Sequence, residues 1–336
     1  MKALVYTRPH EMQLQDRPLP DLADQEVVLQ IEAVGICGSD LHAWHGKDPR
    51  RQPGLVLGHE FVGRIARSAA PGFEPGTRWT GNPLITCGSC DYCVQGRNNL
   101  CTRRTMVGMT RPGAYAEYMS IPAASLVAIP QDMPALTAAP TEPAATAWHA
   151  LALSLRALAR PLHECRALVI GGGAIGILAA QRMQRLGVRA LTVSEPNPGR
   201  RATLAGAVRC EALDPRAAPL PGEAYDYVLD AVGSAVTRTE ALRAVKPGGV
   251  IMHVGLQDWA SEIDMRRLTL AEITLLGTYT YTTADLRATV AALAEGAFGD
   301  LAWVEARRLE QGPQAFVDLD RGAAASPKIV LCNGPA

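Results

Sequence analysis

The stretch ALVIGGGAIGILAAQRMQRLGVRALTVSEP, residues 167–196, decides the fold of this chain. It begins with a short apolar run, passes through a glycine-rich turn and ends in a second apolar run. Between the turn and the second run, the apolar side chains fall on one helical face, at Ile175, Leu178, Ala179, Met183 and Leu186. The order strand, glycine turn, amphipathic helix and strand predicts a βαβ unit with parallel strands.

The glycines of this unit have the spacing of a dinucleotide-binding turn. Gly171, Gly173 and Gly176 follow the pattern GxGxxG where the first strand meets the helix. Such glycines permit a tight turn and let the backbone approach a pyrophosphate at the helix N-terminus. Glu195 ends the second strand nineteen residues after Gly176, where a carboxylate can accept hydrogen bonds from ribose hydroxyls. The predicted cofactor contacts are Gly171, Gly173, Ala174, Ile175, Gly176, Glu195 and Arg200.

The alternation of strands and helices continues after this unit. Residues 225–233, 248–256 and 273–281 predict further strands, and residues 285–295 predict a helix. Successive units of this kind form a doubly wound parallel sheet. Short strand-like pieces after residue 301 lead us to expect that the C-terminal tail returns to the first domain.

The first seventy residues predict a mainly β region. Lys2–Tyr6, Glu26–Ala33 and Glu60–Ala66 are expected strands, separated by Pro, Gly and Asp. No helical period of useful length is visible among them. The region therefore differs in construction from the βαβ part of the chain.

The composition is that of an ordinary globular protein of about two domains. The chain has 336 residues, of which 48% are hydrophobic and 20% are charged. Its 33 basic and 33 acidic residues cancel, which argues against nucleic acid or a membrane surface as a partner. The start of the chain lacks the apolar core of a signal peptide, and no apolar run is long enough to span a membrane. We therefore expect a cytoplasmic protein.

Four cysteines lie close together, in the pattern Cys87-x-x-Cys90-x-x-Cys93 followed after seven residues by Cys101. Four thiolates at this spacing can close a tetrahedral shell around one zinc ion, a structural site without an open position. The alternative is an iron–sulfur cluster, but neither the bacterial nor the plant ferredoxin spacing is matched. We therefore predict structural zinc. The single cysteines are expected to be packed apolar residues, namely Cys165, Cys210 and Cys332.

A second group of metal-ligating residues lies in Gly35–His42 (GICGSDLH) and Gly58–Glu60 (GHE). Cys37 and His59 are ligands of the kind that zinc prefers. A catalytic zinc takes three protein ligands and keeps one position open. The segment between the two motifs, His42–Pro53, is polar and bounded by proline, and it predicts a surface loop.

Within that loop, Arg50 and Arg51 are expected to be solvated.

A helix is predicted to begin near Thr141, where Pro143 would occupy the first turn. Glu142 has a simple explanation at this position, because a carboxylate is favoured at a helix N-terminus. His149 lies on the apolar face of the same helix and is expected to be a core histidine.

Together these motifs resemble the zinc-containing medium-chain dehydrogenases and reductases of the alcohol dehydrogenase superfamily, and the sorbitol and threonine dehydrogenase branch more than the ethanol-oxidising one. The resemblance spans essentially the whole length, including TEPAATAWHA at residues 141–150. It implies an α/β protein with a GroES-like, mainly β catalytic domain and a Rossmann domain with a doubly wound parallel sheet. The expected catalytic domain comprises residues 1–147 and 284–336, and the expected NAD-binding domain comprises residues 148–283.

The resemblance also implies a ligand set for a catalytic zinc. Cys37 and His59 would bind the metal, and Glu60 would bind it or stand directly behind it. Glu142 matches the glutamate that the sorbitol branch has where the ethanol-oxidising branch has a third cysteine. Asp40 would orient His59, as carboxylates commonly do for metal-bound histidine.

The implied proton path uses two further residues. Ser39 would contact the substrate hydroxyl, and His42 would pass its proton outward. The implied catalytic residues are therefore Ser39, His42, Glu60 and Glu142. An alcohol on zinc loses its proton near neutral pH, and hydride can then pass to the nicotinamide.

The expected function is zinc-dependent hydride transfer between NAD(H) and a secondary alcohol or ketone, with two zinc ions per chain. NADP is less expected, because Glu195 repels a 2′-phosphate, although Arg200 and Arg201 lie nearby. The main alternative is a redox-neutral enzyme that modifies a sugar or cyclitol with tightly bound NAD. A metal-free quinone-reductase-like relative and a non-catalytic zinc module are both disfavoured. The family suggests a homodimer or homotetramer.

One position departs from the sorbitol branch. That branch has an arginine after the strand corresponding to residues 273–277, and the alignment places Thr280 there. Threonine is too short and uncharged to replace a guanidinium group with five donors. We therefore expect a substrate with a moderately polar remainder rather than a long free polyol, unless Arg50 or Arg51 supplies a substitute anchor.

Overall fold

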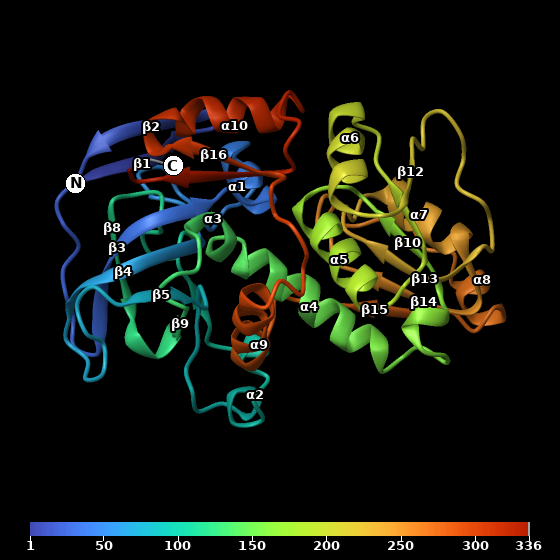
Figure 1. Cartoon of the computed structure of the whole chain (residues 1–336), viewed down its shortest axis with the longest axis horizontal. Helices are drawn as coiled ribbons and strands as arrows, with labels where there is room; N and C mark the ends of the chain where they lie inside the picture. The colour runs from blue at the N-terminus through green and yellow to red at the C-terminus, as the bar shows by residue number, and fades with distance from the viewer. Residues whose placement is uncertain (335–336) are drawn as a thin grey trace.

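The computed structural model describes residues 1–334 and shows two sheets of different construction (Figure 1). The sheet on the right of the figure has six strands, and every neighbouring pair in it is parallel. Its order is β12-β11-β10-β13-β14-β15, the doubly wound order of a dinucleotide-binding domain. The strands are β10 Arg166–Ile170, β11 Ala190–Ser194, β12 Glu211–Leu213, β13 Tyr225–Asp230, β14 Val245–His253 and β15 Thr274–Gly277. The connecting helices are α5 Ala174–Arg185, α6 Pro198–Ala207, α7 Ala235–Ala244 and α8 Met265–Leu270.

The second sheet combines the two ends of the chain. Its order is β16-β17-β3-β4-β5-β9, and β8 pairs with β3 outside that path. The strands are β3 Glu26–Gly35, β4 Glu60–Ser68, β5 Arg78–Gly81, β8 Tyr118–Pro122, β9 Leu126–Ala128, β16 Val304–Arg308 and β17 Lys328–Cys332. The antiparallel pairing of β17 with β3 confirms that the C-terminal tail returns to the N-terminal part.

Smaller elements surround the second sheet. Two short antiparallel pairs are formed by β1 Lys2–Arg8 with β2 Glu11–Asp16 and by β6 Leu84–Ile85 with β7 Thr105–Met106. The helices are α1 Gly38–Trp44, α2 Asp91–Val94, α3 Ala135–Ala138 and α10 Gly312–Asp320, and the 3-10 turns are η1 Asn98–Leu100, η2 Ala123–Ser125 and η4 Leu309–Gln311. A further 3-10 turn, η3 Leu162–Glu164, precedes β10 of the parallel sheet.

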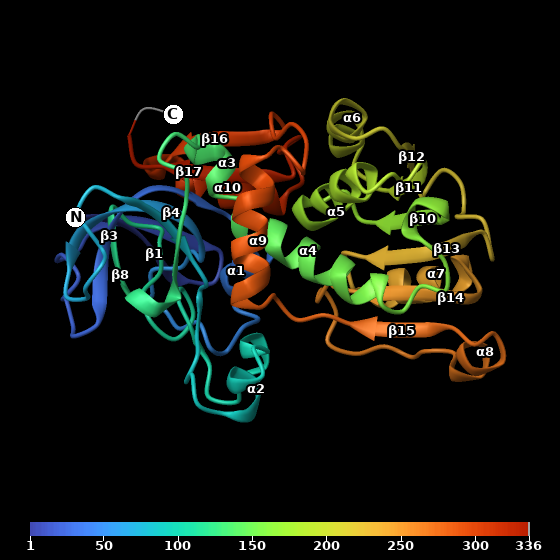
Figure 2. The same ribbon diagram turned by 60° about the horizontal axis from the view of Figure 1, so that its bottom comes forward.

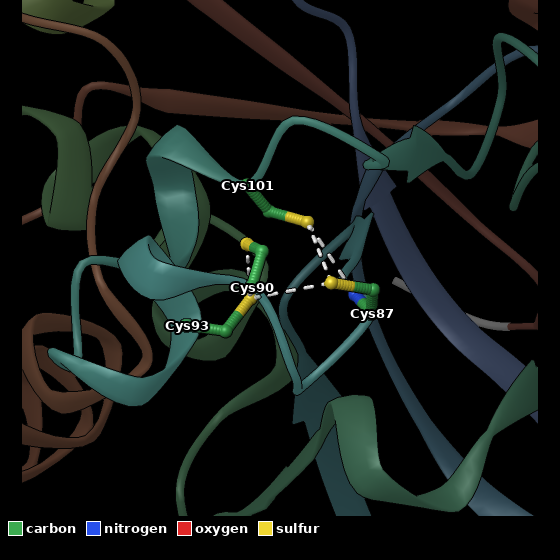
Figure 3. A group of neighbouring side chains, drawn as sticks. All are labelled: Cys87, Cys90, Cys93 and Cys101. Carbon is green, nitrogen blue, oxygen red and sulfur yellow. Dashed lines mark hydrogen bonds between the residues drawn. The ribbon is translucent and has the colours of Figure 1, made fainter.

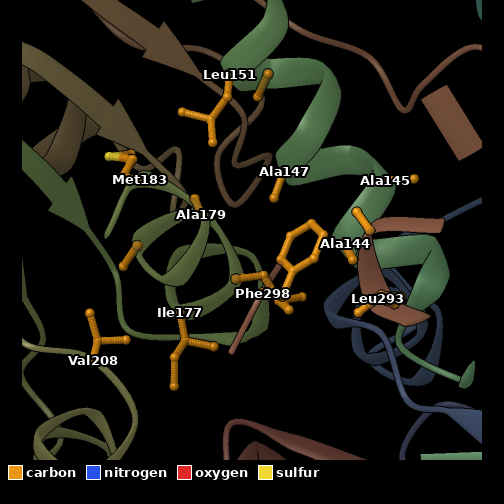
Figure 4. Packing of buried hydrophobic residues seen from close by; sticks show 14 of the residues in the cluster. Ala144, Ala145, Ala147, Leu151, Ile177, Ala179, Met183, Val208, Leu293 and Phe298 are labelled. Carbon is orange, nitrogen blue, oxygen red and sulfur yellow. The ribbon is translucent and has the colours of Figure 1, made fainter. Parts of the chain in front are cut away.

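Two helices, α4 Thr141–Leu155 and α9 Thr283–Ala294, lie between the sheets (Figure 2). The face of α4 toward α5 is built from small side chains, which allow a close approach, and Phe298 fills the space beside Ala144 and Ala147 (Figure 4). One apolar cluster therefore continues from Val62 in β4 through α4 to Ile177 in α5. The predicted domain boundary between residues 147 and 148 falls inside this continuous helix and stays a prediction.

The N-terminal region differs from the sequence expectation in three respects. Residues 38–44 form the short helix α1, which was not expected and which includes the first residues of the expected surface loop, and residues 11–16 add the unexpected strand β2. The expectation that Arg51 is solvated is wrong, because only 3% of this residue is exposed. Arg50 is exposed, as expected. Among the described residues, no helix is both long enough and apolar enough to cross a membrane.

Candidate active site

The glycine turn lies at the carboxyl edge of the parallel sheet, between β10 and β13, where the strand order reverses. Gly171 has φ +98°, and a Cβ there would meet Val232 in the loop after β13. A Cβ at Gly176 would collide with the carbonyl oxygen of Gly171, so α5 can start this close to β10 only with glycine at that position. Nothing lies within 4 Å of a Cβ built on Gly173, which leaves open the space that a pyrophosphate would approach.

Glu195 is buried behind this turn. One carboxylate oxygen accepts a hydrogen bond from the N–H of Gly172 at 2.8 Å, and the other accepts from the N–H of Asn197 at 2.8 Å. The carboxylate therefore joins the glycine turn to the start of α6. Each oxygen can accept a further bond, so the geometry is compatible with the ribose contact expected for Glu195.

The two arginines after Glu195 have different surroundings. Arg201 donates to the carbonyl oxygen of Glu195 at 2.7 Å and pairs with Asp214 at 3.0 Å. The Nε atom of Arg200 is buried and has no hydrogen-bond partner within residues 1–334. Arg200 therefore remains the better candidate for a cofactor contact, while Arg201 is held by protein groups.

Cys37, His59 and Glu60 converge in the second sheet. Their ligand atoms all lie within 4.8 Å of one another, although Cys37 precedes α1 and the other two residues adjoin β4. Burial alone would lower the pKa of His59, but the charges of Asp40 and Cys37 outweigh it and raise that pKa well above its usual value. These surroundings favour positive charge, and a thiolate, an imidazole and a carboxylate form a donor set that suits zinc.

Asp40 lies behind His59, with its Oδ1 3.5 Å from Nδ1 of the imidazole. Burial would raise the pKa of Asp40, but His59, Arg51 and Tyr115 outweigh it and lower the pKa to about 2. The Tyr115 hydroxyl donates to Oδ2 at 2.7 Å, and the backbone N–H of Cys37 also donates to it at 3.3 Å. Asp40 thus stays ionised and connects both ligand-bearing segments.

Arg51, expected in solvent, supports the same segment. Its guanidinium donates to the Ser39 hydroxyl at 3.2 Å and to the Ser39 carbonyl at 3.3 Å. It also donates to Asp48 at 2.6 Å and to the carbonyl oxygen of Gly108 at 3.1 Å. This residue therefore fixes the position of Ser39 on α1.

Glu60 forms a buried ion pair with Lys328, which sequence reasoning did not single out. The Nζ atom of Lys328 donates to both carboxylate oxygens of Glu60, at 2.8 and 2.7 Å, and to the carbonyl oxygen of Ile36. A Cβ at Gly35 would collide with the Glu60 carboxylate. A lone lysine at the start of the apolar strand KIVLC was the available sequence signal.

Glu142 is buried in the first turn of α4, outside the group formed by Cys37, His59 and Glu60. Burial raises the pKa of Glu142 to about 7, and the Glu60 carboxylate acts in the same direction while His59 opposes it. Tyr281, fully buried, lies beside Glu142, and burial together with that carboxylate raises the pKa of its hydroxyl well above the usual value. The structure thus brings Glu142 near the metal-ligand group without showing which residue would complete it.

Ser39 and His42 both lie on α1, three residues apart, so they share one helical face. Burial, followed by the charges of His45, Lys47 and Arg51, lowers the pKa of His42. A neutral imidazole can accept a proton, which fits the expected relay role.

His149 was expected to be a core histidine, but it is half-buried. Its Nδ1 lies 2.8 Å from Oδ2 of Asp285 in α9.

The four clustered cysteines form a separate group around α2 (Figure 3). The Sγ atoms of three pairs lie 3.5, 3.6 and 3.9 Å apart. A tetrahedron with Zn–S bonds of about 2.3 Å has edges of about 3.8 Å, so the sulfur atoms already have the spacing of a zinc shell. Backbone N–H groups of Ser89 and Cys90 lower the pKa of Cys87 to about 5, which favours the thiolate. Of the single cysteines, Cys165 and Cys332 are buried and Cys210 is half-buried.

Comparison with known proteins agrees with both parts of the structure. Residues 23–131 match the alcohol dehydrogenase GroES-like domain, and residues 174–295 match the zinc-binding dehydrogenase domain. The L-threonine 3-dehydrogenase of Chelativorans sp. (strain BNC1) is 34% identical over 83% of each chain.

Solved structures are similar over nearly the full length. A zinc-binding dehydrogenase of Sinorhizobium meliloti 1021 bound to NADP is 28% identical with a TM-score of 0.87, and the match covers 99% of both chains. The acetophenone reductase of Geotrichum candidum NBRC 4597 in complex with NAD is 28% identical with a TM-score of 0.88, covering 99% of this chain and 97% of the other. The sequence match, the two domain types and the converging Cys37, His59 and Glu60 lead to one conclusion: the chain belongs to the zinc-type medium-chain dehydrogenases, on their sorbitol- and threonine-dehydrogenase-like branch.

Proposed function

We propose that the protein transfers hydride between a secondary alcohol or its ketone and a nicotinamide dinucleotide, with two zinc ions bound per chain. The observation that carries this proposal is the convergence of Cys37, His59 and Glu60 within 4.8 Å. Zinc bound there supplies Lewis acidity that eases loss of the alcohol proton, and the nicotinamide accepts the hydride.

The surrounding residues have separable tasks in this proposal. Asp40 orients His59, and Lys328 holds the Glu60 carboxylate. Ser39 accepts the substrate proton, which leaves through His42. Arg51 keeps the Ser39 hydroxyl in place by donating to it, so one lone pair of Ser39 is occupied and the other remains for the substrate hydroxyl.

We further propose that NAD is preferred over NADP. Glu195 would accept from the ribose hydroxyls and repel a 2′-phosphate. Arg201 is engaged by Asp214 and the Glu195 carbonyl, which reduces its attraction for a phosphate. Arg200 is the residue that could weaken the preference, since its Nε has no partner in the described part of the chain.

The proposed substrate has a moderately polar remainder rather than a long polyol chain. The loop after β15 carries threonines and tyrosines, Thr278-Tyr279-Thr280-Tyr281, and no arginine. Arg51 is buried in contacts with Ser39 and Asp48, so it does not provide a free substitute anchor. A short secondary alcohol with one further polar group fits these features.

We also propose that the protein is cytoplasmic.

We propose in addition that copies of the chain associate. β15 is an edge strand of its sheet. Large apolar side chains are exposed along this edge and in the preceding segment, at Leu256, Trp259, Met265, Leu270 and Leu275. Pairing of two such edges would cover the open strand and the apolar surface.

Metal analysis combined with a substrate panel tests the proposed reaction. The wild type should contain two zinc ions and reduce NAD with secondary alcohols, short diols or amino alcohols, with a higher kcat/KM for NAD than for NADP. Cys37→Ser should remain folded, contain one zinc and lose activity. Cys93→Ser should lose the other zinc and fold poorly, because zinc binding stabilises the fold.

Several results would contradict the proposal. Equal zinc content in the wild type and both variants would remove the metal assignments. Better turnover of sorbitol or xylitol than of short alcohols would contradict the substrate class. NAD that co-purifies and resists exchange, without net turnover, would favour the redox-neutral alternative.

A further inference from the structure

The segment around the clustered cysteines, residues 87–104, contacts the loop between β15 and α9, residues 278–282; we call them the cysteine lobe and the substrate-side loop. Asn98 of the lobe accepts a hydrogen bond from the backbone N–H of Thr283 at 3.0 Å. Its Nδ2 donates to the Thr283 hydroxyl at 2.9 Å. One asparagine side chain thus holds the first residue of α9 through two bonds.

The lobe also holds the middle of the loop. Asn99 is buried, and its Nδ2 donates to the carbonyl oxygen of Tyr279 at 2.9 Å. The Arg104 guanidinium stacks on the Tyr279 ring at 4.7 Å from its centroid, and its Nε donates to the Tyr279 hydroxyl at 3.4 Å. In Figures 1 and 2, α2 of the lobe lies close to the end of α9 that follows the loop.

The opposite side of the loop reaches Glu142. Tyr281 is fully buried, and the Glu142 carboxylate is close enough to act with burial in raising the pKa of its hydroxyl. Thr280 has φ +45°, a strained conformation for a β-branched residue. Such a conformation persists only where neighbouring contacts determine it, and the contacts of Asn98 and Asn99 lie on either side of it.

A second route leads from the lobe to the helix that carries Glu142. Asp285 lies in the first turn of α9, two residues after Thr283, which Asn98 holds. Its carboxylate contacts His149 of α4 at 2.8 Å. Glu142 is at the N-terminal end of that same helix. Helix α4 is therefore approached at two places, by Tyr281 of the loop and by Asp285 of α9.

We infer that Asn98 and Asn99 are positioning residues for Glu142: they transmit the folded state of the cysteine lobe through the substrate-side loop to the active site. The cysteine lobe then has a task beyond stabilising its own segment. This inference rests on the proposed function in one respect, namely that Glu142 acts in the active site. Whether the two asparagines hold the loop can be measured even if the protein turns over no substrate.

Two asparagine substitutions separate positioning from general stability. Asn98→Ala and Asn99→Ala should each accelerate amide hydrogen exchange in residues 278–283 by about tenfold, because each removes hydrogen bonds that hold the loop. Exchange in the buried strand β13 should not change. Zinc content and the Kd for NAD should match the wild type, while kcat/KM should fall by about 10- to 100-fold, as is typical for residues that orient metal ligands.

Two matched variants provide the controls. Asn98→Asp keeps an oxygen that can accept from both the N–H and the hydroxyl of Thr283, so it should restore slow exchange. Ser89→Ala removes a lobe hydrogen bond to Arg103 that does not involve the loop, and it should behave as the wild type.

The outcomes are distinguishable. The inference is wrong if both alanine variants keep wild-type exchange and kcat/KM with both zinc ions bound, or if β13 exchanges faster together with the loop. If Asn99→Ala fails to fold, the comparison of Asn98→Ala with Asn98→Asp decides. A wild type without dehydrogenase activity would overturn the proposed function, whereas the exchange data would still decide whether the lobe positions the loop.

Discussion

Arg50 and Arg51 are neighbours in a polar segment and both pair with Asp48, yet the first side chain is exposed and the second is buried. The Arg50 side chain is 61% exposed and pairs with Asp48. The Arg51 side chain is 1% exposed and donates to Ser39, Asp48 and Gly108. Local sequence cannot distinguish the two, because Arg51 is buried by residues far from it along the chain, such as Gly108.

Replacement of each arginine by alanine should therefore give different results. Arg51→Ala leaves the buried carbonyl oxygen of Gly108 without its donor and removes one of the two arginines that pair with Asp48. The free energy of unfolding should therefore fall by about 1–3 kcal/mol, and kcat should also fall. Arg50→Ala should change stability by no more than about 0.5 kcal/mol.

Urea unfolding and steady-state kinetics check this difference. Arg51→Lys retains the charge but not the planar fork, so it should recover stability only partly. Equal effects of the two alanine substitutions would contradict the positioning of Ser39 by Arg51.

At the scale of helices and strands, the parallel sheet was the most predictable part. Its central strands are buried on both faces and read as continuous apolar runs, as at residues 225–233. The predicted strand 273–281 ends instead at Gly277. Thr278–Tyr281 alternates like a strand in the sequence, but contacts from the cysteine lobe hold it as a loop. A tertiary contact of this kind leaves no local pattern.

The candidate site was predictable to a similar degree. The spacing of the cysteines and glycines and the pair Cys37 and His59 could be read from the sequence because metal and phosphate binding restrict residue type. Helix α1 could not, since its seven residues are too few for a visible period. Lys328 was not singled out either, because its partner Glu60 is 268 residues away.

The contact between α4 and α9 should make stability depend on pH. Burial would raise the pKa of Asp285, but hydrogen bonds from His149 and Thr282 outweigh it and lower that pKa. A carboxylate with a lowered folded-state pKa stabilises the fold above the unfolded-state pKa of about 3.9. That stabilisation is lost as the pH falls through the folded-state value.

Asp285→Asn should therefore lower the free energy of unfolding near neutral pH, and the difference from the wild type should shrink below about pH 4. His149→Ala removes the same contact from the other helix, so the double variant should cost less than the sum of the single variants. Urea unfolding from pH 7 down to the acid limit of the wild type measures both effects. A difference that stays constant with pH would argue against an ionised Asp285 as the cause.

For the whole molecule, the open edge at β15 predicts self-association. Leu275 is 40% exposed on this edge strand, and Trp259 in the preceding segment is 89% exposed. Leu275→Lys should reduce the molar mass in solution, because a lysine on an edge strand opposes pairing with a second edge. Leu19→Lys, at an exposed leucine in the other half of the molecule, is the matched control and should leave the mass unchanged.

Light scattering during size-exclusion chromatography measures these masses. A wild type of 35.8 kDa in solution would contradict the proposed association, because that is the mass of one chain. Loss of association in Leu19→Lys but not in Leu275→Lys would place the interface elsewhere.

The pairing of Glu60 with Lys328 also has a consequence for biosynthesis. These residues are 268 positions apart, so at roughly 5–20 residues per second the ribosome needs roughly 13–54 s to translate the interval between them. During that time β3 lacks its partner β17, and the Glu60 carboxylate lacks its counter-ion. The N-terminal part can therefore complete its sheet only after residues 328–332 have been translated, and a premature stop codon shortly before residue 328 would yield a chain without either contact.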